Sequence, residues 1–334
     1  MMKKINVRRG SGKNDFLSLL VLLGLLIFLS VAELSYAGEA KKAVKFPTKP
    51  IKVIVPATAG GSLSREIISI APFIEKYLGQ KVITEYGATV QTMAYNKFHQ
   101  AKPDGYTLVY SSTTSAIQLE MISENVKFSV KDFSPIAACN NKAFVLLVHP
   151  DRWNTFDELL QETKKRPLSM AYTGGAPQMQ YRLMEMFLGT KFKYIPYGAA
   201  GEGSAAVAGQ HVDTLLTFTV SALPMVKAGK LKPLAVFAQK RDSFLPDTPT
   251  LKELGHENVP LVVAYGMFAA PPNTPKEVVA ILEKAIAKAV SDPEFVSLSA
   301  KIGNTLDFKP ASELKQAILN DYDVLTKYKL ATRP

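Results

Sequence analysis

The sequence predicts an α/β protein of two domains, each a mainly parallel sheet flanked by helices. At 334 residues the chain is long enough for two separate cores. Short apolar runs alternate with helix-spaced apolar positions over residues 51–114 and again over 169–218. This strand–helix–strand rhythm is typical of a parallel sheet with helices on its faces. A composition of 47% hydrophobic and 21% charged residues excludes a disordered chain and a many-pass membrane protein.

The first 37 residues have the features of a secretory signal peptide. A lysine- and arginine-rich start precedes an apolar run over 16–32, and Ser35-Tyr36-Ala37 provides the small residues of a cleavage site. We therefore predict residues 1–37 as a signal peptide cut after Ala37. The alternative is an uncleaved membrane anchor, for which the apolar run is slightly short.

A glycine- and hydroxyl-rich turn follows the first predicted strand, Ile51 to Val55. Gly60-Gly61-Ser62 in this turn opens a helix that continues toward Leu78. Glycine allows a ligand to approach the backbone closely, and the first amides of a helix have no internal acceptor. Such a turn therefore suits an anionic group.

Similar turns recur along the chain. Predicted strands at 82–86 and 106–110 follow the first, and the second of these ends in Ser111, Ser112, Thr113 and Thr114. Strands at 169–172, 192–196 and 213–218 lead into Thr173-Gly174-Gly175, Tyr197-Gly198 and the Thr217–Thr219 region. Since ligands collect at the carboxyl ends of parallel strands, we expect these corners to form one site.

The C-terminal helices have no complete sheet of their own. We therefore predict that residues 38–141 and 265–334 share domain 1, and that residues 142–264 are inserted as domain 2. A Thr250–Glu253 capping pair predicts one more helix inside the insert. Two chain crossings, near Asn140 and near Ala264, would form the hinge.

Charge, histidine and cysteine usage exclude several other functions. The leader carries five basic and two acidic residues, which leaves a net charge of +8 on the remainder. The lysines are spread over helix faces without an arginine cluster, so we expect no nucleic-acid partner. Cys139 is the only cysteine and lies in an apolar run, and the four histidines lack metal-ligand spacing. We expect neither a metal site nor a disulfide.

Two motifs bear on catalysis or cofactor binding. Residues 201–206 fit a loose GxGxxA dinucleotide pattern, but the acidic residue expected about 20 positions later is missing. A tight turn explains this pattern, and we expect no cofactor. Ser62 and Ser64 suggest a secreted serine hydrolase as an alternative function, although no nearby histidine would activate them. Helix capping explains both serines, so we expect no enzyme and no catalytic residue.

A set of short segments carries a family resemblance in its order and spacing. The segments are Phe46-Pro47-Thr48-Lys49-Pro50-Ile51, Ile54-Val55-Pro56 with Gly60-Gly61, Ala71-Pro72, Leu78-Gly79-Gln80, residues 102–108, Ile195-Pro196-Tyr197, Ser221-Ala222-Leu223-Pro224, residues 228–236 and residues 245–250. Together they resemble the extracytoplasmic solute receptors of tripartite tricarboxylate transporters, the Bug-type receptors. The resemblance covers nearly the whole of the chain after the leader.

The resemblance implies a two-domain periplasmic binding protein of the type II kind, with two hinge crossings. Such a receptor closes on a small organic carboxylate and presents it to membrane permease subunits; we expect it to be a monomer. Loop amides, hydroxyls and ordered water hold the carboxyl group in this family. Carried onto this chain, the ligand-binding residues are Thr58, Gly60, Gly61, Ser62, Ser111, Ser112 and Thr113 in domain 1 and Thr173, Gly174, Tyr197, Gly198 and Thr217 in domain 2.

The chain departs from the family pattern at several positions. The family usually has acidic residues where Ser64 and Thr217 stand, and the run 86–92 lacks the usual Asn-Arg-Pro-Gly-Ala-Gly-Gly. A proline that often precedes the glycine pair is Ala59 here. Loss of the acidic group removes a partner for an ammonium, which disfavours amino acids as ligands. A receptor that serves a sensor kinase instead of transport is a further alternative.

Overall fold

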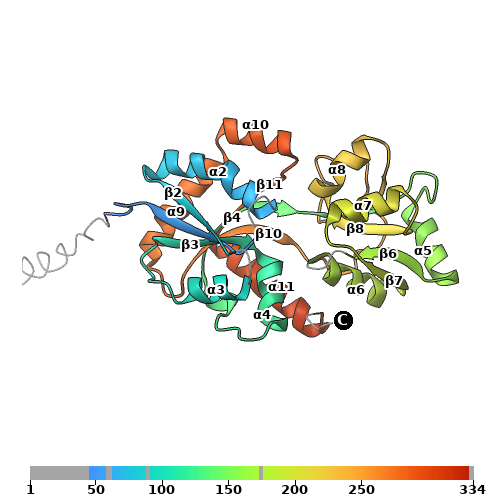
Figure 1. Ribbon diagram of the computed structural model, residues 1–334, viewed down its shortest axis with the longest axis horizontal. Coiled ribbons are helices and arrows are strands. Elements are labelled where there is room, and N and C mark those ends of the chain that lie inside the picture. The colour runs from blue at the N-terminus through green and yellow to red at the C-terminus, as the bar shows by residue number, and fades with distance from the viewer. Residues whose placement is uncertain (1–44, 58–61, 88–90, 173–175, 331–334) are drawn as a thin grey trace, which may run out of the picture. The chain divides into compact units, whose positions relative to one another are not determined.

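Two mixed β-sheets with helices on their faces make up the described part of the chain (Figure 1). The computed structural model describes residues 45–57, 62–87, 91–172 and 176–330. The prediction of an α/β fold with two sheets and two crossings between them is confirmed. Within the described residues, no helix has the length and apolarity needed to cross a bilayer.

The first sheet has six strands in the order β11-β4-β10-β3-β1-β2. We call this sheet and its helices the first lobe. Its strands are β1 (Ile51–Val55), β2 (Val82–Tyr86), β3 (Thr107–Ser112), β4 (Ser134–Lys142), β10 (Ala264–Ala270) and β11 (Leu306–Pro310). Its helices are α2 (Ser62–Leu78), α3 (Gln91–His99), α4 (Thr113–Ile122), α9 (Lys276–Val290), α10 (Pro293–Ile302) and α11 (Ala311–Lys327), and a 3-10 turn, Val130–Asp132, precedes β4.

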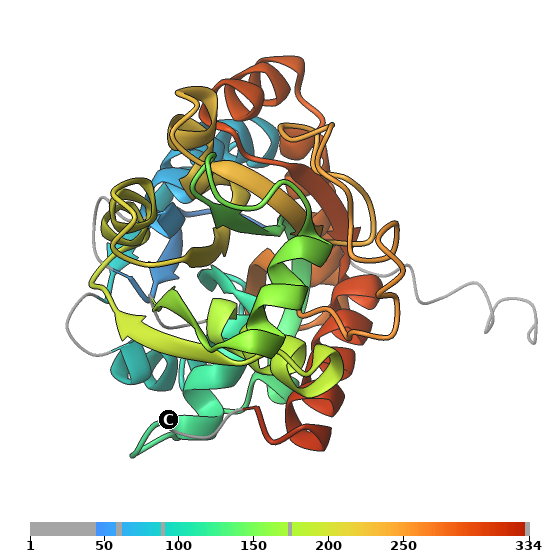
Figure 2. The ribbon, with the colours of Figure 1, turned by 90° about the vertical axis from the view of Figure 1, so that its right-hand side faces the viewer.

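The second sheet has five strands in the order β7-β6-β8-β5-β9. We call this sheet and its helices the second lobe; Figure 2 shows its green and yellow elements toward the viewer. Its strands are β5 (Phe144–Val148), β6 (Leu168–Tyr172), β7 (Phe192–Pro196), β8 (Thr214–Phe218) and β9 (Lys232–Phe237). Its helices are α5 (Phe156–Lys165), α6 (Ala176–Leu188), α7 (Ala200–Ala208) and α8 (Thr219–Lys227).

The sheets differ from the expected mainly parallel arrangement. Strands β1, β2 and β3 are parallel, as are β6, β7 and β8, but β4, β5, β9, β10 and β11 pair antiparallel with their neighbours. The physical reason is the double crossing. The chain leaves the first lobe along β4 and returns along β10, so these adjacent strands must run in opposite directions.

The two crossings differ in length. Only Ala143 separates β4 from β5, whereas residues 238–263 connect β9 to β10. The first sheet therefore contains β1–β4, β10 and β11, and the second sheet contains β5–β9. Because residues 46–334 group into one compact unit, the bounds given above for two domains stay a prediction.

The apolar stripe predicted for the first helix is buried. Ile67, Ile70 and Ile74 of α2 pack against Val53 and Val55 of β1, and each of these five side chains is at most 4% exposed. Burial of such side chains stabilises the fold by about 1.5–3 kcal/mol each. This packing fixes the helix over the sheet and thereby sets the position of its first turn.

Some local predictions were wrong. Thr250 and Glu253 do form the reciprocal capping bonds, with Glu253 N 3.2 Å from Thr250 Oγ1 and Thr250 N 2.8 Å from Glu253 Oε2. No helix follows, because Gly255 has a φ of +81° and turns the chain out of the helical conformation. The sequence pattern also missed α4, α10 and β11, and Gly201 and Gly203 lie inside α7 instead of a tight turn.

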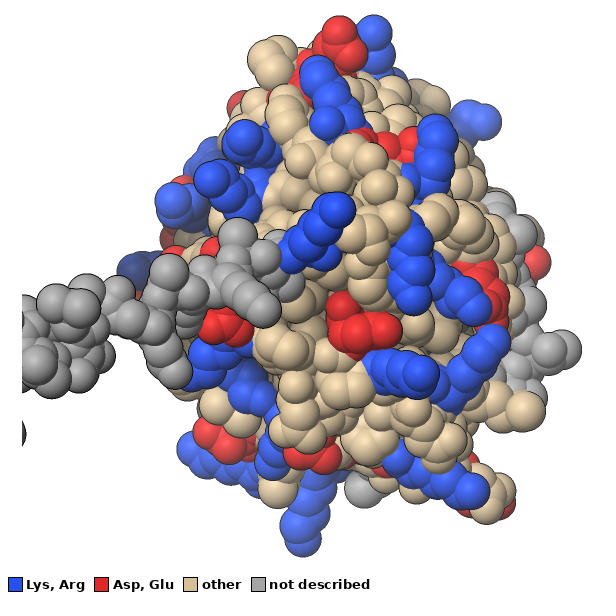
Figure 3. Space-filling view, turned by 90° about the vertical axis from the view of Figure 1, so that its left-hand side faces the viewer, with Lys and Arg blue, Asp and Glu red and all other residues tan. Residues whose placement is uncertain are grey.

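Charged side chains on the face in Figure 3 are dispersed. Lysines and arginines are spread over this face, with acidic residues between them. Exposed pairs such as Lys81–Glu75, with 2.7 Å between Nζ and Oε2, neutralise part of the basic charge. This distribution is that of a solvated surface and forms no basic stripe on this face.

Candidate ligand-binding site

Several helices begin shortly after the carboxyl end of a strand. Helices α4 and α8 start at the residue that directly follows β3 and β8, and α2, α6 and α7 follow β1, β6 and β7 after short loops. Each start presents backbone amides without an intrahelical acceptor. Among the predicted residues, Thr58, Gly60, Gly61, Thr173 and Gly174 lie outside the described residues, and Ser62 is the first residue of α2.

The three predicted residues after the third strand are buried and hydrogen-bonded within the protein. Ser111 bonds the hydroxyl of Tyr95 and donates to the carbonyl of Ser112 at 3.1 Å. Thr113 Oγ1 accepts from Tyr265 N at 3.2 Å and lies 3.4 Å from the carbonyl oxygen of Val263. Thr113 therefore ties the start of α4 to the return crossing.

Ser112 is also satisfied internally. Its hydroxyl lies 3.2 Å from Thr114 Oγ1, and both side chains are at most 4% exposed. Ser111 and Ser112 belong to β3 and Thr113 to α4, whereas the sequence predicted the strand to end at Tyr110. The three predicted residues are therefore next to one another, but their hydroxyl groups already have protein partners.

In the second lobe, Gly198 binds a carboxylate of the protein itself. Its amide donates to Glu202 Oε2 at 2.9 Å, and Glu202 lies in the first turn of α7. Tyr197 precedes it with a half-buried side chain, and its amide donates to the carbonyl of Tyr172 at 2.8 Å. This bond places the corners after β6 and β7 next to each other, and their shared role in ligand binding stays a prediction.

Thr217 occupies a different environment. It lies within β8, pairs with Val145 of β5 and is 1% exposed. The structure therefore places it in the sheet, one residue before Phe218 at the strand end.

Ser64 does not have the surroundings of a nucleophile. It is fully buried, and its hydroxyl donates to the Tyr86 hydroxyl on β2 at 3.1 Å. His99, His149 and His256 lie within 4.0 Å of Asp132, Asp151 and Asp157 respectively. A serine nucleophile requires a base within hydrogen-bond reach, and the contacts of these histidines are elsewhere.

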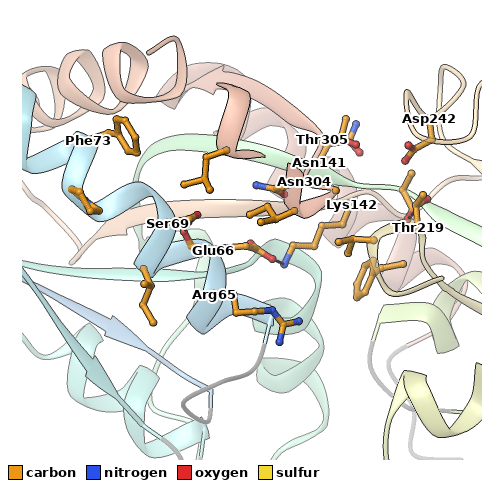
Figure 4. A pocket seen from close by; sticks show the side chains of 18 residues that line it. Arg65, Glu66, Ser69, Phe73, Asn141, Lys142, Thr219, Asp242, Asn304 and Thr305 are labelled. Carbon is orange, nitrogen blue, oxygen red and sulfur yellow. Dashed lines mark hydrogen bonds and ion pairs between the residues drawn. The ribbon is translucent and has the colours of Figure 1, made fainter. Parts of the chain in front are cut away.

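A pocket of about 460 Å³ lies between α2 and α8 and is lined from both lobes (Figure 4). We call it the α2–α8 pocket. Its lining residues are Arg65, Glu66, Ile68, Ser69, Pro72 and Phe73 of α2, Asn141, Lys142 and Ala143 at the first crossing, Phe218, Thr219, Val220 and Asp242 of the second lobe, and Leu298, Ile302, Gly303, Asn304 and Thr305. Of the predicted residues that the structure describes, Ser111, Ser112, Thr113, Tyr197, Gly198 and Thr217 do not line this pocket.

The inner end of the pocket holds a buried ion pair. Lys142 Nζ lies 2.8 Å from Glu66 Oε1, with the two side chains 6% and 10% exposed, and Figure 4 shows them pointing toward one another. Glu66 Oε2 accepts from the Tyr110 hydroxyl at 2.7 Å and from Asn140 Nδ2 at 3.2 Å. Asn140 Oδ1 in turn accepts from Gly266 N at 3.1 Å. We call these five residues the Glu66 network.

Burial and charge set the protonation behaviour around the network. Burial, together with the nearby Glu66 carboxylate, raises the pKa of the Tyr110 hydroxyl well above its ordinary value. The same two causes raise the pKa of the Cys139 thiol. Both groups therefore stay neutral at physiological pH, which makes Cys139 an unreactive core residue.

The sequence contains a signal for the Glu66 network in the placement of its charged residues. Glu66 stands next to Ile67 in an apolar stripe, and Asn140-Asn141-Lys142 interrupts two apolar runs. Charged residues are almost never fully buried unless they are paired. A search for opposite charges inside apolar segments would have suggested Glu66 and Lys142 as partners.

Comparison with known proteins identifies the family. The model of the TctC family, the tripartite tricarboxylate transporter family receptors, matches residues 68–323. The chain belongs to this family. It is similar to a UPF0065 protein of Bordetella pertussis, with 32% identity over 278 residues that cover 81% of this chain and 86% of the relative.

Solved structures agree with this assignment. A TctC solute-binding protein from Polaromonas is 25% identical, with a TM-score of 0.76 over 85% of this chain and 98% of the other. The periplasmic binding protein BugD is 25% identical, with a TM-score of 0.69 over 85% and 99% of the two chains. This TctC-family chain is therefore a periplasmic-type solute-binding receptor. Its family and these neighbours are receptors and not enzymes, so the hydrolase alternative is unsupported.

Proposed function

We propose that this TctC-family receptor captures a small organic carboxylate at the strand–helix corners and delivers it to a tripartite tricarboxylate-type permease. The observation that carries the proposal is the bond from the Gly198 amide to the Glu202 carboxylate. A corner that accepts a carboxylate of its own chain has the donor geometry for a ligand carboxylate. The family description supports the same ligand class.

The proposed ligand-binding residues are those predicted from the sequence. They are Thr58, Gly60, Gly61, Ser62, Ser111, Ser112, Thr113, Thr173, Gly174, Tyr197, Gly198 and Thr217. Backbone amides at helix starts carry partial positive charge and bind anions without a lysine or arginine. Because several of the hydroxyl groups are already bonded internally, the amides would supply most of the ligand contacts.

The location and partners follow from the same proposal. Residues 1–37 would direct export to the periplasm, and residues 142–264 would move as one domain against the rest of the chain. Closure around the two crossings would bury the ligand, and the closed monomer would then dock on the permease subunits. Co-purification with those subunits in the presence of ligand tests delivery, and recovery of a sensor kinase in their place would overturn it.

Calorimetry tests the binding step. The protein, expressed from its full sequence, would be titrated with di- and tricarboxylates, and in parallel with amino acids and sugars. We expect saturable binding of at least one carboxylate and weaker or undetected binding of amino acids. Silence across all carboxylates, from a protein that melts cooperatively, would contradict the proposed function.

A further inference from the structure

The α2–α8 pocket has walls that suit an apolar molecule. Pro72 and Phe73 of α2 face the pocket together with Leu298 and Ile302 of α10, and Val220 of α8 lines it from the second lobe. Its volume of about 460 Å³ lies in the range of small-molecule sites. An apolar body of several carbons would lose its water contacts along these walls.

The ammonium of Lys142 supplies the polar end of the pocket. A lysine ammonium has three N–H donors. One is directed to Glu66 at 2.8 Å, and the face of Phe218 lies 5.8 Å from Nζ. Among the described residues, Lys142 has no second hydrogen-bond acceptor. With its side chain 6% exposed, the remaining donors favour an acceptor that enters the pocket.

The charges that line the pocket decide which part of a ligand dominates binding. Arg65 and Lys142 are balanced by Glu66 and Asp242, so the pocket has no net charge of its own. Glu66 already accepts from three groups, and Asp242 Oδ1 accepts from Phe244 N at 2.8 Å. Long-range attraction therefore contributes little, and the apolar body must supply most of the affinity while Lys142 selects the head group.

We propose that the α2–α8 pocket is a second binding site, specific for a carboxylate that carries an apolar body. The carboxylate would accept from Lys142 Nζ, and an aromatic or alkyl body would lie against Phe73, Leu298 and Ile302. Phe218 and Thr219 of the β8–α8 corner line the pocket, whereas among the described residues Ser111, Ser112, Thr113, Tyr197 and Gly198 of the other corners do not. Because both lobes line it, its occupant would also bias the arrangement of the two lobes.

Three matched probes separate the contribution of the carboxylate from that of the apolar body. 4-Phenylbutanoate carries both groups, 4-phenylbutan-1-ol lacks the carboxylate, and acetate lacks the apolar body. By calorimetry on the protein expressed from its full sequence, we expect the alcohol to bind about tenfold more weakly than the acid. Acetate should not bind at millimolar concentration. Equal binding of acid and alcohol, or no binding of the acid, would overturn the proposal.

A pocket-filling variant locates the binding. Ile302→Trp adds bulk at a lining residue, whereas Val296→Trp adds it on the same helix at a position outside the pocket; the native side chains are 42% and 45% exposed. We expect Ile302→Trp to weaken 4-phenylbutanoate binding at least tenfold and Val296→Trp to leave it within twofold. Equal effects of the two variants would contradict the assignment.

A structure of the complex gives a test that does not depend on a variant. At saturating 4-phenylbutanoate, we expect the acid in the α2–α8 pocket with its carboxylate on Lys142. Density for the acid only at the strand–helix corners would overturn the second site while supporting the proposed function. Binding of 4-phenylbutanoate in the pocket without any binding of di- or tricarboxylates would support the second site and overturn the proposed function.

Discussion

Lys142 Nζ lies 2.8 Å from Glu66 Oε1, so the last residue of β4 is paired with the first turns of α2. Through Glu66 and Asn140 this pair is also connected to Tyr110 of β3 and Gly266 of β10. The end of one crossing strand and the start of the other therefore share one buried network. The network therefore connects α2, whose start belongs to the proposed ligand site, to both crossing strands.

Breaking the ion pair should destabilise the protein strongly. Lys142→Met leaves a buried carboxylate without its cation, and Glu66→Gln leaves a buried ammonium without its anion. Removal of one partner of a buried pair costs about 3–5 kcal/mol. We expect each variant to lose a free energy of unfolding of this order in urea denaturation, and the double variant to lose less than the sum.

An exposed pair provides the control for this measurement. Lys81 Nζ lies 2.7 Å from Glu75 Oε2 with 77% of the lysine side chain exposed. Lys81→Met should change the free energy of unfolding by at most about 1 kcal/mol. If the Lys142 and Lys81 variants lost a similar free energy of unfolding, the Glu66–Lys142 pair would not stabilise the fold as a buried ion pair.

Gly266 leaves no room for a side chain. A Cβ there would lie 2.4 Å from Asn140 Oδ1 and 2.5 Å from the Tyr110 hydroxyl oxygen. Gly266→Ala must push the network apart, and we expect a loss of about 1–3 kcal/mol by thermal or urea unfolding. Gly201→Ala is the matched control: a Cβ meets nothing within 4 Å, and the change should be neutral or stabilising by up to about 1 kcal/mol. An unchanged free energy of unfolding for Gly266→Ala would contradict the close packing of Gly266 against Asn140 and Tyr110.

Asp321 of α11 should make stability fall as pH rises. Burial raises its pKa to about 8 from 3.8, and its Oδ2 has no hydrogen-bond partner among the described residues. Between these two pH values the folded state keeps a proton that the unfolded state has lost, so raising the pH favours unfolding. Asp321→Asn should remove this dependence and raise the free energy of unfolding at pH 8 by on the order of a few kcal/mol.

Asp323→Asn on the same helix is the control for this pH series, because Asp323 is exposed. Denaturation of the three proteins between pH 4 and pH 8 is the measurement. Parallel pH profiles for the native chain and Asp321→Asn would show that Asp321 is not the titrating group.

Removal of the Glu202 carboxylate should strengthen ligand binding at the Gly198 corner. Glu202 Oε2 accepts from the Gly198 amide at 2.9 Å and would compete with a ligand carboxylate. Glu202→Ala frees this donor, and a charge-assisted hydrogen bond is strong enough for a gain of several-fold in affinity. Calorimetry with the bound carboxylate is the test. Glu257→Ala, at an exposed position, makes the same charge change and should have no comparable effect; weaker binding by Glu202→Ala would mean that Glu202 instead shapes the loop.

Much of the fold could be predicted because its signals are local. The stripe of Ile67, Ile70 and Ile74 predicts the face that α2 buries, and short apolar runs predict β1, β2 and β3. The antiparallel direction of β10 and β4 was not predicted, because strand direction depends on pairing between residues more than 120 positions apart. Helix α4 was missed since its Thr-Thr start continues the β-branched pattern of the preceding strand.

The site was predicted less completely than the fold. Gly198 was predicted as a ligand-binding residue, but its hydrogen bond to Glu202 was not, because Glu202 could be recognised only as part of a helix start. The α2–α8 pocket was missed entirely, because α2, α8 and α10 meet there from three distant parts of the sequence. The spacing of neighbouring residues in the sequence cannot predict a contact between such distant elements.

Local sequence determined most of the helices and strands, the family and the amide-rich corners, because periodicity and turn chemistry act over a few neighbouring residues. Tertiary structure alone decided which polar groups became partners. Glu66 pairs with Lys142, 76 positions later in the chain, and Ser64 of α2 donates to Tyr86 of β2, because a buried polar group needs a partner and the fold decides which one is near.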